Sequence, residues 1–476
     1  MRNLTLLTDL YQLTMGQGYF EHGKRKKEAV FDLFFRPNKL ITYSVAAGME
    51  QVCEYLENFH FEPDEIEYLR SLGIFGSDYL DYLKELRFTG SVDAVREGEI
   101  VFPYEPILTV RAPMIEAQLV ETALLTIVNH QTLIASKAAK ICAQTKGGVM
   151  EFGLRRAQGA DAGLYGARAA IIGGCVSTSN VLAGKMFGVP VAGTMAHSWI
   201  MSFDSELDAF RAYAKSFPEN CLLLVDTYDT LKSGVPNAIK VFGELRTLGY
   251  SPKGIRLDSG DLAYLSKTAR KMLDAAGFCD ALICASGDLD ENSIRSLLSQ
   301  GAKIDLWGVG TKLITSADLP ALGGVYKLAA IIEDGREIPK IKLSDTTEKI
   351  TNPACKELYR IYDKNTGKAI ADYITLAGEF VDESKPLTLF HPVDTWKKMT
   401  IDHFTARPLR ERIFECGRRT LEKRTLSELS RYRAEETARF WDEYMRQDVP
   451  HIYKVDLSDK LYALKRGLID RGDGNV

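Results

Sequence analysis

The stretch ALICASGDLDENSIRSLL at residues 281–298 contains the unit that decides the fold. A short apolar run is followed by a Gly-Asp turn and then by a helical segment. Such units recur from residue 148 at intervals of roughly 15–35 residues, which predicts parallel strands joined by helices instead of hairpins. The apolar strands end near Phe152, Val176, Ala192, Val225, Leu257, Ala285, Leu306 and Tyr326.

Seven or eight such units in about 180 residues predict an irregular (β/α) barrel, smaller than the usual barrel of about 250 residues. An open doubly wound sheet is the alternative, and both folds bind ligands at the carboxyl ends of their strands. At 476 residues the chain is long for one core. We expect an N-terminal α+β domain at 1–143, the barrel with the active site at 144–340, and a mixed and helical region at 341–476 that packs back on the N-terminal domain.

The flanking regions have their own local patterns. Apolar spacing or composition predicts helices at 4–20, 46–85, 115–143 and, in a strongly charged segment, 407–446. Strands are predicted at 29–36, 91–111, 359–363 and 387–390.

The composition excludes several function classes. Sixty basic and 64 acidic residues give a net charge of −4, so no electrostatic footprint for nucleic acid or an anionic membrane is present. No apolar run approaches the roughly 18 residues of a membrane span, and polar residues interrupt any N-terminal signal sequence. The eight cysteines are scattered without a C-x-x-C pair, which argues against disulfides or a protein-held metal. We expect a cytoplasmic protein.

Two turns have the composition of a phosphate site. ASGD at 285–288 and GVGT at 308–311 each follow a predicted strand. Glycine beside Ser or Thr lets backbone amides and hydroxyls approach phosphate oxygens. One such turn is usually only a tight turn, but two on neighbouring strands late in a barrel match the sector where barrels bind phosphate.

Three arginines stand at the same predicted rim: Arg155, Arg156 and Arg256. A guanidinium is the natural bidentate partner of carboxylate or phosphate. A salt bridge explains one such arginine well and three together poorly, so these residues are candidate substrate contacts.

His197 follows the Gly193-Thr194 turn and begins a helical segment. A neutral imidazole there could accept a phosphoryl group or act as a base, although a lone histidine is more often structural. Asp226 and Asp229 on the next strand are candidates to orient it, with helix capping as the alternative, above all for Asp229.

Asp258, in the turn RLDSGD at 256–261, could bind ribose hydroxyls or hold Mg²⁺, which needs only one or two protein carboxylates when it bridges phosphates. The residue types alone therefore predict an enzyme for a phosphorylated, ribosyl substrate.

Seven segments, in order and spacing, resemble nicotinate phosphoribosyltransferase. The resemblance covers residue 4 to about 330, and the tail agrees less specifically. The segments are LTDLYQLTM (7–15), EFGLRRAQG (151–159), TSNVLAG (178–184), GTMAHS (193–198), DTYDT (226–230), RLDSGD (256–261) and GVGT (308–311).

The resemblance implies an activity and its partners. That family joins nicotinate to 5-phosphoribosyl 1-diphosphate, the first step of NAD biosynthesis from nicotinate, and releases nicotinate mononucleotide and diphosphate. It couples this step to ATP hydrolysis through a transient phosphohistidine. Mg²⁺ accompanies ATP and 5-phosphoribosyl 1-diphosphate, no cofactor is tightly bound, and a homodimer shares its active sites.

The resemblance also assigns roles to single residues. His197 matches the phosphorylated histidine, with Asp226 to orient it, Asp258 at the ribose and Thr194 beside the substrate. Phe152 and Arg155 match the residues that stack on the pyridine ring and meet the phosphate side of the product, and Tyr11 of a second subunit would close over the ring. Arg256 would face the nicotinate carboxylate, and Asn180 would bind the substrate. The 5-phosphate would lie against Ser286, Gly287, Gly308, Gly310 and Thr311. Ordinary core packing is the alternative for Tyr11 and Phe152.

Four alternatives remain open. Nicotinamide-using relatives carry Asp at the position of Asn180, which favours nicotinate here, and quinolinate-using relatives lack the ATP-linked histidine. A non-catalytic nucleotide sensor would not need to keep His197. An unrelated barrel enzyme such as an aldolase would need a Schiff-base lysine, for which only Lys312 and Lys327 are candidates.

Overall fold

The computed structural model describes residues 3–38, 40–394 and 396–472, and the chain divides into two compact units. The first unit combines Met1–Leu133, Ala321–Arg424 and Arg431–Val476, and the second combines Ile134–Pro320 and Thr425–Ser430. The main segment of the second unit, Ile134–Pro320, overlaps the central domain that the sequence predicts at 144–340.

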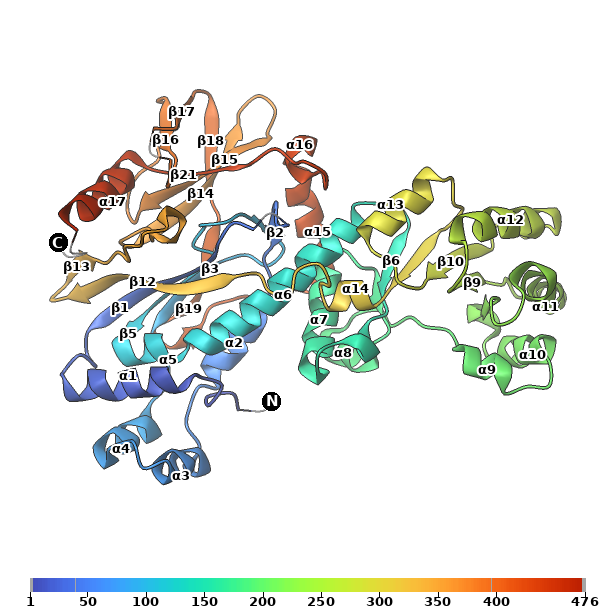
Figure 1. Ribbon diagram of the computed structural model, residues 1–476, viewed down its shortest axis with the longest axis horizontal. Coiled ribbons are helices and arrows are strands. Elements are labelled where there is room, and N and C mark those ends of the chain that lie inside the picture. The colour runs from blue at the N-terminus through green and yellow to red at the C-terminus, as the bar shows by residue number, and fades with distance from the viewer. Residues whose placement is uncertain (1–2, 39, 395, 473–476) are drawn as a thin grey trace. The chain divides into compact units, whose positions relative to one another are not determined.

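A parallel sheet of six strands forms the centre of the second unit (Figure 1). In spatial order the strands are β7 (Ser177–Thr178), β6 (Gly148–Glu151), β11 (Leu306–Val309), β10 (Leu282–Ser286), β9 (Gly254–Leu257) and β8 (Leu222–Leu224). The helices of this unit are α7 (Ala160–Ile172), α8 (Val181–Phe187), α9 (His197–Met201), α10 (Glu206–Ser216), α11 (Val235–Thr247), α12 (Leu262–Ala275), α13 (Glu291–Ser299) and α14 (Thr311–Ile314), with single turns at η1 (Leu154–Arg156), η2 (Pro218–Asn220) and η3 (Thr230–Gly234).

The mixed α/β class is confirmed, and closure of the sheet into a barrel of seven or eight strands is not. Across the described residues no pairing joins the edge strands β7 and β8, so the sheet stays open. Two expected strands are missing from it. Val191, beside Ala192, makes only an isolated bridge to Thr178, and Tyr326 lies in β12 (Gly324–Glu333), which pairs antiparallel with β1 (Glu28–Phe35) in the other unit.

The first unit joins segments from both ends of the chain. One sheet has the order β13 (Arg336–Pro339), β12, β1, β5 (Leu108–Pro113), β3 (Ser91–Val95), β19 (Arg410–Glu415), β20 (Arg418–Arg419). A second has the order β17 (Lys398–Ile401), β16 (Leu387–Phe390), β21 (Lys454–Leu457), β15 (Ala369–Leu376), β14 (Lys356–Asp363), β18 (Phe404–Pro408), and β2 (Ser44–Val45) pairs with β4 (Ile100–Val101). N-terminal and C-terminal segments of the chain thus contribute to the same unit.

The helices predicted in the N-terminal part of the chain are present, and further helices lie near the C-terminus. They are α1 (Leu10–Glu21), α2 (Met49–Glu57), α3 (Pro63–Ser71), α4 (Ser77–Glu85), α5 (Met114–Leu119), α6 (Glu121–Cys142), α15 (Leu426–Thr437), α16 (Asp442–Met445) and α17 (Asp459–Arg471), with the turn η4 (Thr347–Lys349).

The prediction of a charged helical segment at 407–446 is wrong in its first part. Residues 410–415 form β19, which pairs antiparallel with β3. Arg412 bonds Asp93 across the strands at 2.6 Å while Ile413 and Phe414 are buried. The charges are therefore cross-strand partners on a sheet, which their number alone does not distinguish from a polar helix face.

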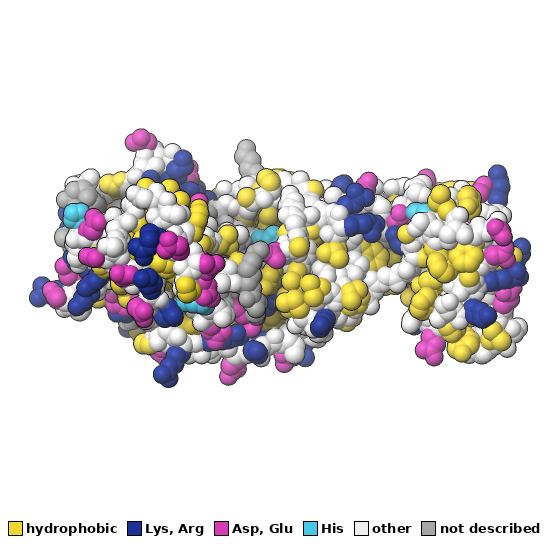
Figure 2. Space-filling view, turned by 90° about the horizontal axis from the view of Figure 1, so that it is seen from below, with side chains coloured by type: hydrophobic (Ala, Val, Ile, Leu, Met, Phe, Trp, Pro, Cys, Tyr) yellow, Lys and Arg dark blue, Asp and Glu magenta, His cyan; other side chains and the backbone are white. Residues whose placement is uncertain are grey.

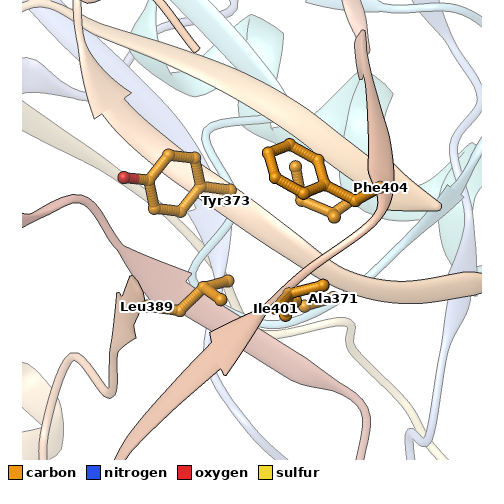
Figure 3. Packing of buried hydrophobic residues seen from close by; sticks show 6 residues of the cluster. Ala371, Tyr373, Leu389, Ile401 and Phe404 are labelled. Carbon is orange, nitrogen blue, oxygen red and sulfur yellow. The ribbon is translucent and has the colours of Figure 1, made fainter. Parts of the chain in front are cut away.

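The second sheet of this unit has its own apolar core. The side chains of Ala371, Tyr373, Leu389, Ile401 and Phe404 gather on one side of it, and Figure 3 shows them converging from β15, β16, β17 and β18. Strand alternation places these residues on one face.

No described helix is long and apolar enough to cross a membrane. All eight cysteines have free thiols.

Candidate active site

A cavity of about 550 Å³ opens at the carboxyl ends of the parallel strands. Every residue that lines it belongs to the second unit. The lining consists of Phe152, Arg155, Arg156, Ser179, Gly193, Thr194, Met195, Ala196, His197, Leu224, Arg256, Asp258, Ser286, Gly287, Asp288, Gly308, Gly310 and Thr311. Most of the site residues predicted from the sequence are therefore brought together.

The two glycine turns lie side by side because β10 and β11 pair with Ser286 opposite Gly308. Gly287 has φ +95°, a left-handed conformation that side chains rarely adopt. A Cβ on Gly308 would come within 3.0 Å of the Phe152 ring. The glycines thus allow close approach, and backbone N–H groups of both turns can face one anion.

Arg256, Asp258 and Ser286 form one network at the ends of β9 and β10. Arg256 donates from Nε to Ser286 Oγ at 2.8 Å and from Nη2 to Asp258 Oδ1 at 2.7 Å. Ser286 Oγ also donates to Asp258 Oδ1. Burial raises the pKa of the Asp258 carboxyl, but the Ser286 hydrogen bond and the Arg256 charge outweigh it, so the pKa lies below its usual value. Asp258 is therefore an anion at neutral pH.

His197 begins α9, and its Nε2 lies 3.4 Å from Asp226 Oδ1. The imidazole is 40% exposed and the carboxylate only 2% exposed. Asp226 also accepts hydrogen bonds from the Asp258 backbone N–H at 2.9 Å and from Ser259 Oγ at 2.6 Å. A fixed carboxylate thus orients a ring that remains accessible from the cavity.

The aromatic and cationic part of the cavity comes from the segment after β6. The Phe152 N–H donates to Val309 O at 2.8 Å, which fixes the start of the segment, and the Arg256 guanidinium lies 5.8 Å from the Phe152 ring centroid. Arg155 and Arg156 are exposed, and neither has an ion-pair partner within the described parts of the chain. Both are available to an anionic ligand.

Four predicted residues lie away from the cavity lining, and one of them, Asp226, is the buried partner of His197. Tyr11 is on α1 of the first unit and is 47% exposed. Asn180 is buried; its Nδ2 donates to Gly163 O at 3.1 Å and its Oδ1 caps α8 through the Ala183 N–H. Asp229 caps η3 through the Leu231 and Lys232 N–H groups, which is the alternative role that its position in the sequence allows.

Among the polar side chains of the lining, two were not predicted from the sequence, Ser179 and Asp288. Each is adjacent to a residue or motif that the sequence singles out, in TSNVLAG and ASGD. Position within a motif is the only signal for them, and it does not say which of two neighbours faces the ligand. The Thr194 hydroxyl, a predicted substrate contact, is buried at the cavity without a hydrogen-bond partner in the described structure.

No cluster of three His, Cys, Asp or Glu side chains suited to a metal occurs among the described residues. The cavity offers Asp258, already bonded to Arg256, and Asp288. Such a donor set fits a Mg²⁺ ion that arrives on substrate phosphates and takes one or two protein carboxylates.

Family models match nearly the whole chain. Residues 6–129 match the nicotinate phosphoribosyltransferase (NAPRTase) N-terminal domain, residues 148–368 the nicotinate phosphoribosyltransferase (NAPRTase) family, and residues 355–465 the nicotinate phosphoribosyltransferase C-terminal domain.

Individual relatives agree with these matches. Nicotinate phosphoribosyltransferase of Bacillus subtilis (strain 168) is 49% identical over 468 residues, 97% of this chain and 94% of that protein. The Homo sapiens protein of the same name is 33% identical, covering 97% of this chain and 96% of its own. The crystal structure of human nicotinic acid phosphoribosyltransferase superposes with a TM-score of 0.86 at 30% identity, over 97% of this chain and 99% of that chain.

Proposed function

The chain belongs to the nicotinate phosphoribosyltransferase family, and from that premise we propose how its cavity carries out the transfer and couples it to ATP. The enzyme transfers the 5-phosphoribosyl group of 5-phosphoribosyl 1-diphosphate to nicotinate, which is a glycosyl transfer of NAD biosynthesis. We propose which residues perform each step, how ATP is coupled to the transfer and how the subunits are arranged.

The observation that carries the proposal is the meeting of two glycine turns, three arginines and His197 in one cavity. Ser286, Gly287, Gly308, Gly310 and Thr311 hold the 5-phosphate through backbone N–H groups and hydroxyls. Asp258 accepts hydrogen bonds from the ribose hydroxyls, because its carboxylate is ionised and faces the cavity.

Nicotinate binds with its ring against Phe152 and its carboxylate toward the guanidinium groups. Arg256 lies next to that ring and keeps N–H donors beyond those used by Ser286 and Asp258. Arg155 adds a second, unpaired cation. The preference for nicotinate over nicotinamide rests on this positive charge, since the Asn180 amide is bonded to Gly163 and Ala183 and is not part of the cavity lining.

Bond cleavage at the anomeric carbon builds positive charge on the ribose ring while diphosphate leaves as the anion. The residues align the pyridine nitrogen with that carbon and exclude water, so little covalent chemistry is needed from the protein. Asp258 and Asp288 would hold a Mg²⁺ ion that arrives on the substrates, and such an ion would supply positive charge for the leaving diphosphate.

ATP acts through His197. An imidazole nitrogen attacks the γ-phosphorus, an N–P bond forms, the bond to the β-γ bridging oxygen breaks, and ADP leaves. Asp226 stabilises the positive charge that develops on the ring. After the transfer, water attacks the phosphorus and releases phosphate and the free imidazole. The added charge beside the cavity favours a tight-binding state while it persists.

His197→Ala tests this coupling. We expect the variant to lose ATPase activity and ATP stimulation and to keep slow, ATP-independent formation of nicotinate mononucleotide. If ATP still accelerates the variant, His197 is not the acceptor.

Two copies of the chain form the enzyme and share their active sites, with Tyr11 closing over the ring bound by the partner subunit. Exposed apolar side chains support an interface: Leu10 and Tyr11 on α1 are 54% and 47% exposed, and Val181 and Leu182 on α8 are 72% and 54% exposed. Hydrophobic side chains also gather in patches on the face of the second unit seen in Figure 2.

Mixing Tyr11→Ala subunits with His197→Ala subunits, which lack ATP-stimulated activity, tests the shared site. A heterodimer then has one intact site, and an equal mixture regains about a quarter of the wild-type ATP-stimulated activity. Activity that stays at the level of the separate variants would contradict a shared site.

A further inference from the structure

An acidic segment stands directly beside the glycine turns. Asp288 lines the cavity, and Asp290 and Glu291 follow within three residues at the start of α13. Carboxylates so close to a phosphate site repel the substrate unless cations balance them. Two lysines supply that balance, Lys312 for Asp290 and Lys137 for Glu291.

Lys312 balances Asp290. It follows Thr311 of the second glycine turn, and its Nζ lies 2.8 Å from Asp290 Oδ2, with side chains 40% and 15% exposed. Asp290 is also the N-cap of α13, accepting the Ser293 N–H at 2.7 Å. The ion pair therefore joins the residues that follow the two turns, beyond the last backbone pairing at Ser286 and Gly308.

Lys137 balances Glu291 on the buried side. Its Nζ lies 2.8 Å from Glu291 Oε1 and 2.6 Å from Asp318 Oδ1, and Lys137 is 5% exposed. Glu291 thus has a fixed, solvent-shielded cation. Asp290 depends on Lys312, the exposed partner, whose pKa is raised by its hydrogen bond to Asp290.

We propose that Lys312 is a positioning residue for 5-phosphoribosyl 1-diphosphate, which neutralises Asp290 and ties the two phosphate-binding turns together without itself touching the phosphate. The proposal rests on the proposed function, because it assumes that these turns hold the 5-phosphate. Removal of Lys312 should therefore weaken the affinity for this substrate, because the negative charge of Asp290 is no longer neutralised.

Lys312→Met tests the proposal through steady-state kinetics. We expect the KM for 5-phosphoribosyl 1-diphosphate to rise about three- to fivefold at low salt, the range of a partly exposed ion pair. The kcat and the KM for nicotinate stay unchanged, because the lost interaction stabilises the bound substrate and the transition state by the same free energy. The rise shrinks at high ionic strength because salt screens the uncovered charge.

The double variant Lys312→Met/Asp290→Asn gives the decisive comparison. Asn still caps α13 but carries no charge, so the second substitution should return the KM to within about twofold of wild type. Arg211→Met is the matched control: it breaks an exposed pair with Glu244 at 2.6 Å between α10 and α11 and leaves the KM unchanged.

Each other outcome has a separate meaning. If Asp290→Asn does not rescue Lys312→Met, Lys312 contacts the phosphate directly and the proposal is overturned. An unchanged KM in Lys312→Met, or a loss of thermal stability alone, also overturns it. A wild-type enzyme that makes no product from 5-phosphoribosyl 1-diphosphate would instead refute the proposed function, whatever the variants do.

Discussion

Gly287→Ala offers a test in which the structure sets both the site and the size of the effect. Gly287 has φ +95°, which costs an L-residue about 1–2 kcal/mol. A Cβ there would also lie within 3.0 Å of the Asp258 carbonyl oxygen, so the backbone of that residue must shift. Overpacking of this kind costs about 1–3 kcal/mol. Together we expect a loss of about 2–5 kcal/mol in the free energy of unfolding of the second unit.

The same shift reaches the chemistry, because the Asp258 carboxylate bonds Arg256 and Ser286. We expect the KM for 5-phosphoribosyl 1-diphosphate to rise at temperatures where the variant is folded. Urea unfolding followed by circular dichroism measures stability, and initial rates measure the KM. Gly243→Ala in α11 is the control: nothing lies within 4 Å of its Cβ, so a gain of about 0.5–1 kcal/mol is expected. Equal stability and equal KM in Gly287→Ala and wild type would refute the reasoning.

Three further predictions concern ionisable side chains whose charge depends on a bonded partner or on burial. Asp226→Asn removes the anion beside His197 and should lower the ATP-stimulated rate about tenfold or more, with little change in the rate without ATP. Arg360→Met removes a fully buried cation bonded to Asp372 and Glu99 and should cost about 3–5 kcal/mol in urea unfolding, against less than about 1 kcal/mol for the exposed Arg211→Met. Burial lowers the pKa of Lys465 to about 8, so between about pH 8 and 10.4 the unfolded chain binds the extra proton and this lysine's contribution to stability rises with pH. The stability difference between wild type and Lys465→Met should therefore change by about 3 kcal/mol across that window, and a constant difference would contradict the burial argument.

The edge of the parallel sheet that carries the cavity could be predicted, because the sequence itself shows where each of these strands ends. Apolar runs such as LICAS stop at a glycine turn, and parallel strands bring those turns to one edge. Local sequence thus contains both the strand and the turn. This is enough to place Arg256 and Ser286 at one rim from the sequence alone.

Whether the sheet closes could not be predicted from the sequence, because it depends on strand partners far away in the chain. The apolar strand around Tyr326 resembles its predecessors locally, yet it pairs with β1, where Leu33 lies opposite Tyr326. Its register is set by the antiparallel sheet of the first unit. No periodicity within the strand contains that information.

The direction of neighbouring side chains within a turn was equally hidden. Ser179 lines the cavity while Asn180, one residue later, turns inward to cap α8 and bond Gly163. Asn is a favoured N-cap, so its structural role follows from the helix that starts after it. The hydrogen bonds of Asn180 to Gly163 and Ala183 therefore compete with a contact to substrate.

The central claim is that the cavity transfers a phosphoribosyl group to nicotinate and is coupled to ATP. The most direct measurement is diphosphate release from 5-phosphoribosyl 1-diphosphate by the purified chain with nicotinate, with nicotinamide and with no base, each with and without ATP. We expect rapid release with nicotinate, faster still with ATP, and little release with nicotinamide or without a base. Equal release with nicotinamide, or release that does not depend on a base, would contradict it.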